Sequence, residues 1–151
     1  MMENEEQAWL DGLRKWCSSQ ERCTHDVRER LQRKGADEAT ADAIQAQLEA
    51  EGFLSEQRFA EAFVRARALY KGWGPAKIRA GLKAKRVPDA AIEAGFAALE
   101  GKAFDTSLAE LVQRRVNELP EGRDRLIRWL LSRGFSLGSI LSELEALERG
   151  G

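Results

Sequence analysis

The sequence predicts an all-α protein built from three tandem three-helix repeats that form an elongated, curved array. Two observations argue against a sheet: β-branched residues are scarce, and no apolar–polar alternation is long enough for a strand. A third favours helices directly, because apolar residues recur at spacings of three and four residues along the chain. A hydrophobic content of 43% is enough to build a core, so wholesale disorder is not expected.

The first repeat, residues 1–52, is expected to contain three helices. The first spans 5–19, the second is capped by the Thr24 hydroxyl and ends at Gly35, and the third spans about 37–50. The residues predicted to face the core are Trp9, Leu13, Trp16, Val27, Leu31, Ala41, Ile44 and Leu48.

The second repeat, residues 53–100, begins with a helix capped by Ser55. The turn Gly72-Trp73-Gly74-Pro75 ends this helix and starts the next, which runs to about Lys85. Pro88 then opens a third helix. The pattern predicts core positions at Phe59, Phe63, Ala66, Tyr70, Ile78, Leu82, Ile92, Phe96 and Leu99. The place of Trp73 stays open between a packing wedge and a surface on which a nucleic-acid base stacks.

The third repeat, residues 101–151, follows the helix break at Gly101. One helix is expected to continue until Pro120, a second to span 123–132, and a third to span about 136–148. The expected core residues are Leu108, Leu111, Val112, Val116, Leu126, Trp129, Leu130, Ile140, Leu144 and Leu147.

The three groups of helices can be laid over one another with offsets of 51 and 48 residues. With these offsets the helix ends Gly35, Arg86 and Gly134 coincide, as do the apolar residues that precede them. A period near 50 residues is typical of stacked repeats, in which each unit buries its apolar stripe against its neighbours. The alternative is a compact helical bundle whose register is accidental.

Positive charge is concentrated in the middle of the chain. The segment from Arg58 to Arg86 carries a net charge of +8, whereas the whole chain has −1. Such a patch attracts phosphate groups or acidic protein surfaces, although a solvated helix face is the simpler explanation. The candidate residues for binding a partner or nucleic acid are Arg58, Arg65, Arg67, Lys71, Trp73, Lys77, Arg79, Lys83, Lys85 and Arg86. Within this set, Arg79, Lys83 and Arg86 are expected to share one stripe of a helix.

No motif in the sequence predicts an enzyme, a cofactor or a metal. The glycines of the Gly72-Trp73-Gly74-Pro75 turn lack the spacing of a phosphate-binding loop. Cys17, Cys23 and His25 offer at most three ligands and are interpreted as ordinary reduced cysteines and a surface histidine. The acidic N-terminus does not resemble a secretion signal, and no apolar run approaches the roughly 18 residues of a membrane span. These features favour a cytoplasmic protein without a membrane partner.

The segment EGFLSEQRFAEAFVRARALYKGWGPAKIRAGLKAKRV resembles the core block of the RecX family, which regulates the RecA recombinase. It contains the glycine–aromatic–leucine entry, the RFAxxF helix, the GxGP turn followed by a basic residue and isoleucine, and a basic helix. The segment ERCTHDVRERLQRKG is similar to the opening helix of the family. Three positions depart from the family pattern: Thr24 replaces the usual serine, Ser55-Glu56 stands where an aspartate pair or similar acidic turn is common, and Arg86 replaces a glycine.

The resemblance implies a non-enzymatic inhibitor that binds RecA filaments on single-stranded DNA, with weak or filament-associated contact to the strand itself. The sequence leaves the oligomeric state open, and a monomer is the expectation. Family members damp ATP hydrolysis, strand exchange and co-protease activity, and so modulate recombinational repair and the SOS response. The resemblance leaves open whether such a protein caps filament ends or lies along the filament groove.

The alternative is a helix-turn-helix-like nucleic-acid-binding module without RecA specificity. The helix that would read bases begins Pro75-Ala76-Lys77-Ile78, which suits phosphate contact better than base recognition. The regulator is therefore the preferred interpretation.

Overall fold

The computed structural model describes residues 3–150, and its regular structure there is entirely helical. Each of the three repeats contributes three α-helices, and a short 3₁₀ turn (η1) follows the first helix of the third repeat. The elements are α1 Asn4–Ser19, α2 Thr24–Arg33, α3 Glu38–Ala50, α4 Glu56–Leu69, α5 Pro75–Ala84, α6 Asp89–Ala97, α7 Ala103–Arg114, η1 Val116–Glu118, α8 Arg123–Ser132 and α9 Leu137–Gly150. No helix in this part of the chain combines the length and the apolar composition of a membrane span.

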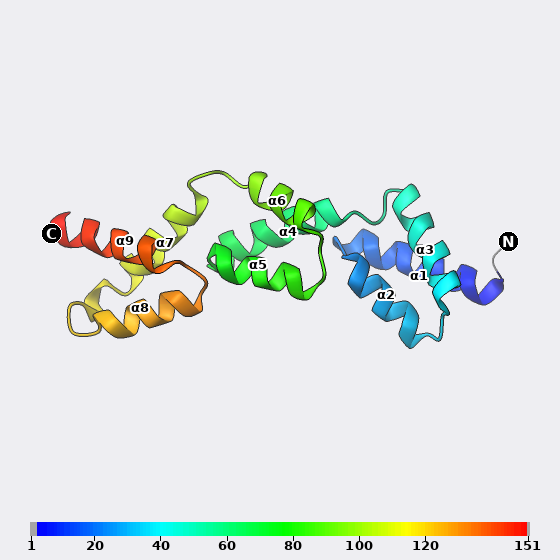
Figure 1. The fold of residues 1–151 in the computed structure, drawn as a ribbon, viewed down its shortest axis with the longest axis horizontal. Coiled ribbons are helices and arrows are strands. Elements are labelled where there is room, and N and C mark those ends of the chain that lie inside the picture. The colour runs from blue at the N-terminus through cyan, green and yellow to red at the C-terminus, as the bar shows by residue number, and fades with distance from the viewer. Residues whose placement is uncertain (1–2, 151) are drawn as a thin grey trace.

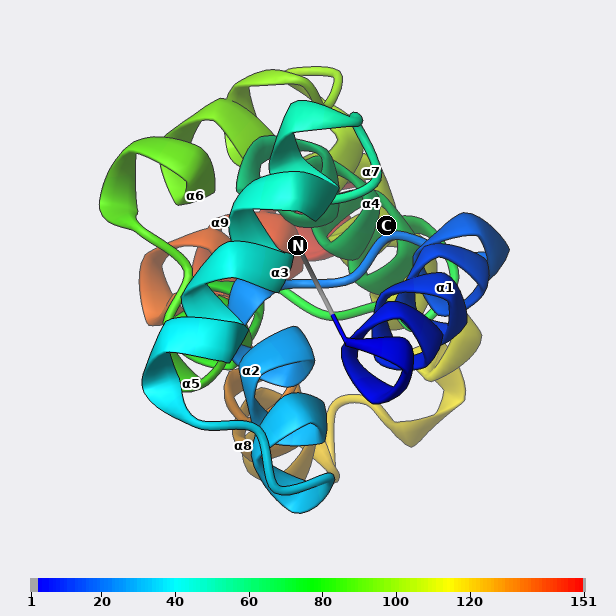
Figure 2. The same cartoon turned by 90° about the vertical axis from the view of Figure 1, so that its right-hand side faces the viewer.

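The three helix groups follow one another along the long axis of the molecule, with the chain ends at opposite tips (Figure 1). The middle helices α2, α5 and α8 lie on the same side of the array, as the view along this axis also shows (Figure 2). The all-α class and the elongated arrangement of three-helix repeats are thus confirmed.

Three separate clusters of buried residues correspond to the three groups. Leu10 and Leu13 of α1 lie in the first cluster, Phe59 and Ile78 in the second, and Leu126 in the third. Cys23 is an exception, because it precedes α2 in sequence but lies fully buried in the cluster of the second group. Each group therefore has its own core, and neighbouring groups share residues at their junctions.

The middle helix of every repeat ends in the same left-handed turn. Gly35, Arg86 and Gly134 have φ angles of +92°, +58° and +103°, respectively. In each case the next residue donates its N–H to a carbonyl five positions earlier, as in Val87 to Leu82 at 3.1 Å. Arg86 therefore keeps the backbone conformation for which glycine is the usual residue, although its side chain makes that conformation costly.

Two local predictions were wrong. The Thr24 hydroxyl does not cap α2, because Thr24 is the first residue of the helix and Cys23 is the N-cap. The Thr24 N–H donates instead to the Glu56 carboxylate at 2.8 Å. The seventh helix ends at Arg114, so Val116 lies in the following 3₁₀ turn instead of the helix. There the Arg115 side chain donates to Glu118 at 2.7 Å, which stabilises the turn.

The junction between the second and third repeats is formed by backbone atoms in close contact. The Gly74 N–H donates to the Arg133 carbonyl at 2.7 Å, and the Ala76 N–H donates to the Gly134 carbonyl at 3.0 Å. The Arg133 guanidinium in turn donates to the carbonyl of Lys71. The GxGP turn thus connects the second repeat to the end of α8.

Candidate partner-binding surface

Helices α4 and α5 carry the basic segment and are fixed by the core of the second repeat. As predicted, the Ser55 hydroxyl caps α4 by accepting from the Arg58 N–H at 3.2 Å. Phe59 and Phe63 are buried, and their rings lie 5.7 Å apart. Gly81 of α5 faces Phe63 closely, since a Cβ there would lie 2.9 Å from the Phe63 ring. The missing side chain lets α5 pack directly on α4.

Trp73 is a packing residue in this structure. Its ring meets Phe63 in an edge-to-face arrangement with centroids 6.4 Å apart, and it packs against the second core cluster. The Lys77 ammonium lies 4.5 Å from the Trp73 ring centroid, and the Arg67 guanidinium lies 5.4 Å from it. Trp73 is thus partly buried with two cations beside its ring, which favours the packing wedge over a surface on which a base stacks.

The prediction that Tyr70 belongs to the core was wrong. The Tyr70 side chain is 82% exposed, and α4 instead buries Ala60, Val64 and Ala68 beside its phenylalanines. Tyr70 is the C-cap residue, just past the last residue of α4, Leu69. Helical spacing predicts the direction of its side chain, but burial also requires another element to cover the ring, and the exposure shows that it is left uncovered.

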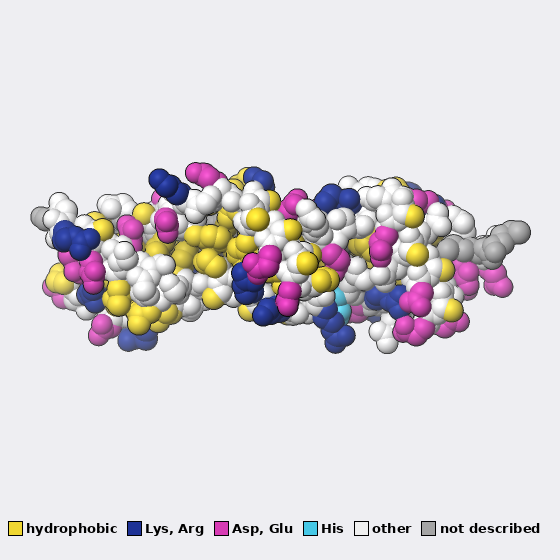
Figure 3. All heavy atoms as spheres, turned by 45° about the horizontal axis from the view of Figure 1, so that its top comes forward, with side chains coloured by type: hydrophobic (Ala, Val, Ile, Leu, Met, Phe, Trp, Pro, Cys, Tyr) yellow, Lys and Arg dark blue, Asp and Glu magenta, His cyan; other side chains and the backbone are white. Residues whose placement is uncertain are grey.

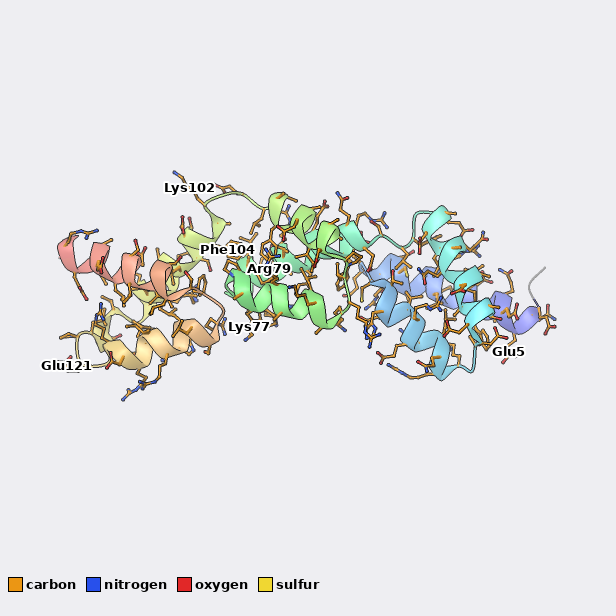
Figure 4. All side chains as sticks on the ribbon, viewed as in Figure 1. Glu5, Lys77, Arg79, Lys102, Phe104 and Glu121 are labelled. Atoms are coloured by element: carbon orange, nitrogen blue, oxygen red, sulfur yellow. The ribbon has the colours of Figure 1, made fainter. Side chains whose placement is uncertain are left out.

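We call the candidate cations Arg79, Lys83 and Arg86 the α5 row. Arg79 and Lys83 lie about one turn apart on α5, but the prediction that Arg86 shares their helix stripe was wrong, because α5 ends at Ala84 and Arg86 lies in the left-handed turn that follows. Arg79 forms an ion pair with Glu93 of α6, and its guanidinium lies 4.7 Å from the Phe96 ring centroid. Lys83 and Arg86 are exposed and form no ion pair within residues 3–150. Figure 4 shows that Lys77 and Arg79 project in different directions from α5, so Lys77 does not belong to the row.

Two other candidate cations hold the first and second repeats together. Arg58 pairs with Glu21 at 3.0 Å and also donates to the Gly52 carbonyl at 2.7 Å. Lys85 pairs with Asp26 of α2 at 3.0 Å. Because these acids belong to the first repeat, part of the predicted positive patch is neutralised by the acidic flank.

The remaining candidates lie on α4 and just after it. Arg65 and Lys71 are exposed, while the Arg67 guanidinium stacks 4.2 Å from the Phe63 ring centroid. Arg65 and Arg67 lie on different faces of α4, because two residues along a helix correspond to a rotation of roughly 200°. The ten candidate residues therefore occupy several surfaces instead of one stripe.

A groove of about 860 Å³ adjoins the α5 row at the junction of the first and second repeats. His25, Arg28, Arg58 and Arg86 line it together with Glu49 and Glu56. Arg28 is paired with Glu38 and Asp42, and Arg58 with Glu21, so Arg86 is the arginine of this wall that forms no ion pair within residues 3–150. On the face drawn in Figure 3, the Lys and Arg side chains over the middle of the molecule are interspersed with Asp and Glu side chains. Arg86 belongs to both the row and the groove, so the two form one continuous surface.

A smaller groove of about 210 Å³ occupies the equivalent junction between the second and third repeats. In the repeat alignment, Pro75 and Ala76 of this groove correspond to Thr24 and His25 of the larger one. Gly134 and Ser136 likewise correspond to Arg86 and Pro88. Its other walls include Phe104, Leu108 and Phe135, so this groove is mainly apolar. The repeats therefore present two grooves at equivalent positions with different chemistry.

The cysteines and the histidine do not come together as a metal site. Cys17 and Cys23 are both free and buried, and they belong to different core clusters. Burial raises the pKa of the Cys23 thiol to about 11 and also raises the pKa of Cys17. The His25 ring lies near the Asp26 and Glu29 carboxylates, but Lys85 pairs with Asp26 and Arg33 pairs with Glu29. These pairings make the cluster an ordinary set of surface charges.

Sequence reasoning missed three residues that shape this surface. Glu56 supplies the acceptor for the start of α2, and Arg133 anchors the loop after α4. Tyr70 projects from the same loop into solvent. The contacts of Glu56 and Arg133 join residues that are 32 and about 60 positions apart, so no local pattern signals them.

Comparisons with known proteins agree with this architecture. The family model described as "RecX, second three-helix domain" matches residues 55–95, which include α4, α5 and most of α6. The crystal structure of RecX from Lactobacillus salivarius has a TM-score of 0.81 at 19% identity, covering 96% of this chain and 97% of that one. This likeness concerns the fold.

Sequence relatives extend the match beyond the second repeat. The regulatory protein RecX of Thermus thermophilus is 38% identical over 104 residues, which cover 69% of this chain and 68% of the relative. The regulatory protein RecX of Xanthomonas oryzae pv. oryzae is 34% identical over 120 residues, covering 76% and 73%. With this identity over more than two thirds of its relatives, the chain belongs to the RecX family of regulatory proteins.

Proposed function

We propose that this protein binds RecA filaments on single-stranded DNA, as a monomer in the cytoplasm, and inhibits the RecA ATPase, strand exchange and co-protease activity. In this role it modulates recombinational repair and the SOS response. The observation that carries the proposal is the α5 row, which adjoins the groove between the first and second repeats of an elongated array. Membership in the RecX family supports the choice of RecA as the partner.

The shape of the array suits a polymeric partner. A filament presents the same subunit surface many times, and an extended body can contact more than one subunit at once. Linked contacts raise affinity without any single strong site. The α5 row and its groove then supply the electrostatic part of the interaction, since Lys83 and Arg86 are free of ion pairs within the described residues.

The helix-turn-helix alternative is disfavoured by the junction between the second and third repeats. A recognition helix commonly approaches DNA with its N-terminal end. In this structure the N–H groups of Gly74 and Ala76, at the start of α5, already donate to the Arg133 and Gly134 carbonyls. The third repeat thus occupies the end of α5 that would have to approach the bases.

The test is inhibition of DNA-dependent ATP hydrolysis by RecA at physiological salt. We expect the wild-type protein to inhibit, and the double variant Arg79→Glu/Lys83→Glu to need at least roughly tenfold more protein for half-inhibition, a change of about 1.4 kcal/mol, because reversed charges repel the surface that the cations attract. The matched control is Lys15→Glu/Lys102→Glu, which changes the net charge equally at two exposed lysines outside the α5 row. Circular dichroism checks that both variants keep their helix content.

Two outcomes contradict the proposal. A wild-type protein that leaves RecA turnover unchanged contradicts RecA regulation itself. If the Arg79→Glu/Lys83→Glu variant inhibits as well as the Lys15→Glu/Lys102→Glu control, the α5 row is only a solvated helix face. Tight, sequence-selective binding to duplex DNA would favour the helix-turn-helix alternative instead.

A further inference from the structure

The loop after α4 exposes two large apolar side chains among cations. Tyr70 is 82% exposed and the preceding Leu69 is 49% exposed, which makes Tyr70 the most exposed of the large hydrophobic side chains in residues 3–150. They line a hollow of about 250 Å³ between the end of α4 and the outer face of α7. The other residues of this hollow are Lys71, Gly72, Ser107, Glu110, Leu111, Arg114 and Arg133.

The charge around this hollow is predominantly positive. Lys71, Arg114 and Arg133 contribute cations and Glu110 contributes the one acid of its lining. None of the three cations forms an ion pair within the part of the chain that the structure describes. This distinguishes them from Arg58, Arg79 and Lys85, whose charges are matched by acids. The hollow therefore carries positive charge that no ion pair among the described residues neutralises, at Lys71 after α4 and at Arg114 of α7, and it is distinct from the α5 row.

The loop that carries Tyr70 is held in place. The Tyr70 N–H donates to the Ala66 carbonyl at 3.0 Å as the last bond of α4. Beyond it, the Arg133 side chain donates to the carbonyls of Lys71 and Gly72. Because these bonds fix the backbone on which Tyr70 stands, only the side chain has to be ordered on binding, which favours its use as a contact surface.

We propose that Tyr70 stacks against a base of single-stranded nucleic acid while Lys71 and Arg114 contact the neighbouring phosphates. The proposal rests on the proposed function, because it assigns where the strand within the filament touches this protein. An exposed aromatic ring beside cations is the combination with which proteins hold single strands without sequence preference. Bases of a duplex stack on one another and leave no face for Tyr70.

A protein partner fits this surface less well. The centre of a protein–protein interface is depleted of charged residues, whereas here the apolar area is limited to Leu69 and Tyr70 and is bordered by Lys71 and Arg114. Cations around so small an apolar area suit the phosphates of a strand, while the apolar area itself suits one of its bases.

The experiment measures binding of a fluorescein-labelled oligothymidylate of roughly 20 nucleotides, longer than typical single-strand sites, by fluorescence anisotropy. We expect Tyr70→Ala to weaken binding about fivefold to 150-fold, as expected for the loss of one base–aromatic stack. Tyr70→Phe keeps the ring and should bind like the wild type. Tyr70→Leu keeps apolar bulk without the flat ring and should bind like Tyr70→Ala. Because the side chain is largely exposed, all three variants should unfold at the wild-type urea concentration.

A salt series supplies an independent readout. Replacing one phosphate-contacting cation, as in Lys71→Gln, should reduce the slope of log K against log salt concentration by about 0.7. The control Lys15→Gln, an exposed lysine of α1, should leave this slope unchanged.

Several results would overturn the inference: no binding of the oligomer by the wild type, unchanged affinity in Tyr70→Ala, or wild-type affinity in Tyr70→Leu. The last result would indicate an apolar protein contact instead of stacking. The outcome is separable from the proposed function, because RecA inhibition is tested through the α5 row. If the wild type inhibits RecA but Tyr70→Ala binds the oligomer normally, only the Tyr70 assignment fails. If Tyr70→Ala loses the oligomer but the wild type does not inhibit RecA, only the proposed function fails.

Discussion

The contact between Gly74 and Gly134 gives the most direct test of how the repeats are joined. A Cβ at position 74 would lie 2.4 Å from the Gly134 carbonyl carbon, 2.5 Å from its oxygen and 2.5 Å from the Phe135 nitrogen. All three are backbone atoms, which cannot move aside as a flexible side chain can. The Gly74→Ala variant must therefore separate the GxGP turn from the end of α8.

The cost follows from the bonds that this separation breaks. Two backbone hydrogen bonds, from Gly74 to Arg133 and from Ala76 to Gly134, contribute about 1 kcal/mol each. The charged hydrogen bond from the Arg133 guanidinium to the Lys71 carbonyl contributes about 1.5–3 kcal/mol. Gly74→Ala should therefore lower the free energy of unfolding by roughly 3–5 kcal/mol, a large share of the 5–15 kcal/mol typical of a domain.

Urea unfolding, followed by circular dichroism and tryptophan fluorescence, measures this loss. For an m-value of about 2 kcal/mol/M the midpoint should fall by roughly 1.5–2.5 M. The matched control is Gly12→Ala in the middle of α1, where a Cβ meets nothing within 4 Å. That substitution should stabilise the protein by about 0.5–1 kcal/mol, because alanine favours the helix. A Gly74→Ala midpoint equal to the wild-type value would refute this account of the junction.

Three further predictions concern individual residues. Arg86→Gly should raise the free energy of unfolding by about 0.5 kcal/mol, because glycine adopts the left-handed conformation at φ +58° without the strain of a Cβ. This gain outweighs the greater conformational freedom that glycine gives the unfolded chain, and a lower urea midpoint would contradict the prediction. Glu56→Gln should lower stability by about 1 kcal/mol by weakening the bond to the Thr24 N–H, and an unchanged thermal midpoint would count against that bond. For Cys23 the folded-state pKa is raised from 9.0 to about 11, so the neutral thiol stabilises the fold fully below pH 9, and this contribution is lost as the pH rises towards 11. Over this range the free energy of unfolding of the wild type should fall by on the order of 2 kcal/mol more than that of Cys23→Ala. Parallel pH profiles of the two proteins in urea unfolding would show that the thiol does not contribute.

Much of the fold could be predicted because it depends on local rules. The ends of α8 at Arg123 and Ser132, the Ser55 cap and the register of Gly35, Arg86 and Gly134 all follow from spacing, capping and chain-breaking residues. The periodic apolar residues also identified most of the core, including Leu31, Leu82 and Leu130. These features need only residues a few positions apart, which the sequence displays directly.

The candidate surface depended on contacts that the sequence does not display. The positive charges of Arg58 and Lys85 are neutralised by ion pairs with Glu21 and Asp26 of the first repeat. Tyr70 fits the helical period but lies one residue past the end of its helix, so the tertiary arrangement leaves it in solvent. Periodicity predicts which side of a helix faces inward, but not where neighbouring repeats meet or which charges they pair.

The sequence by itself thus determined most of the helices, since these depend on residue type and on spacing within about one turn. It also determined the repeat and the family, since the same local patterns recur along the chain about 50 residues apart. Only the tertiary structure decided which cations are free, because an ion pair such as Lys85–Asp26 joins side chains 59 positions apart. It also decided that Trp73 packs inward and Tyr70 faces solvent, because burial depends on what the rest of the chain places against a residue.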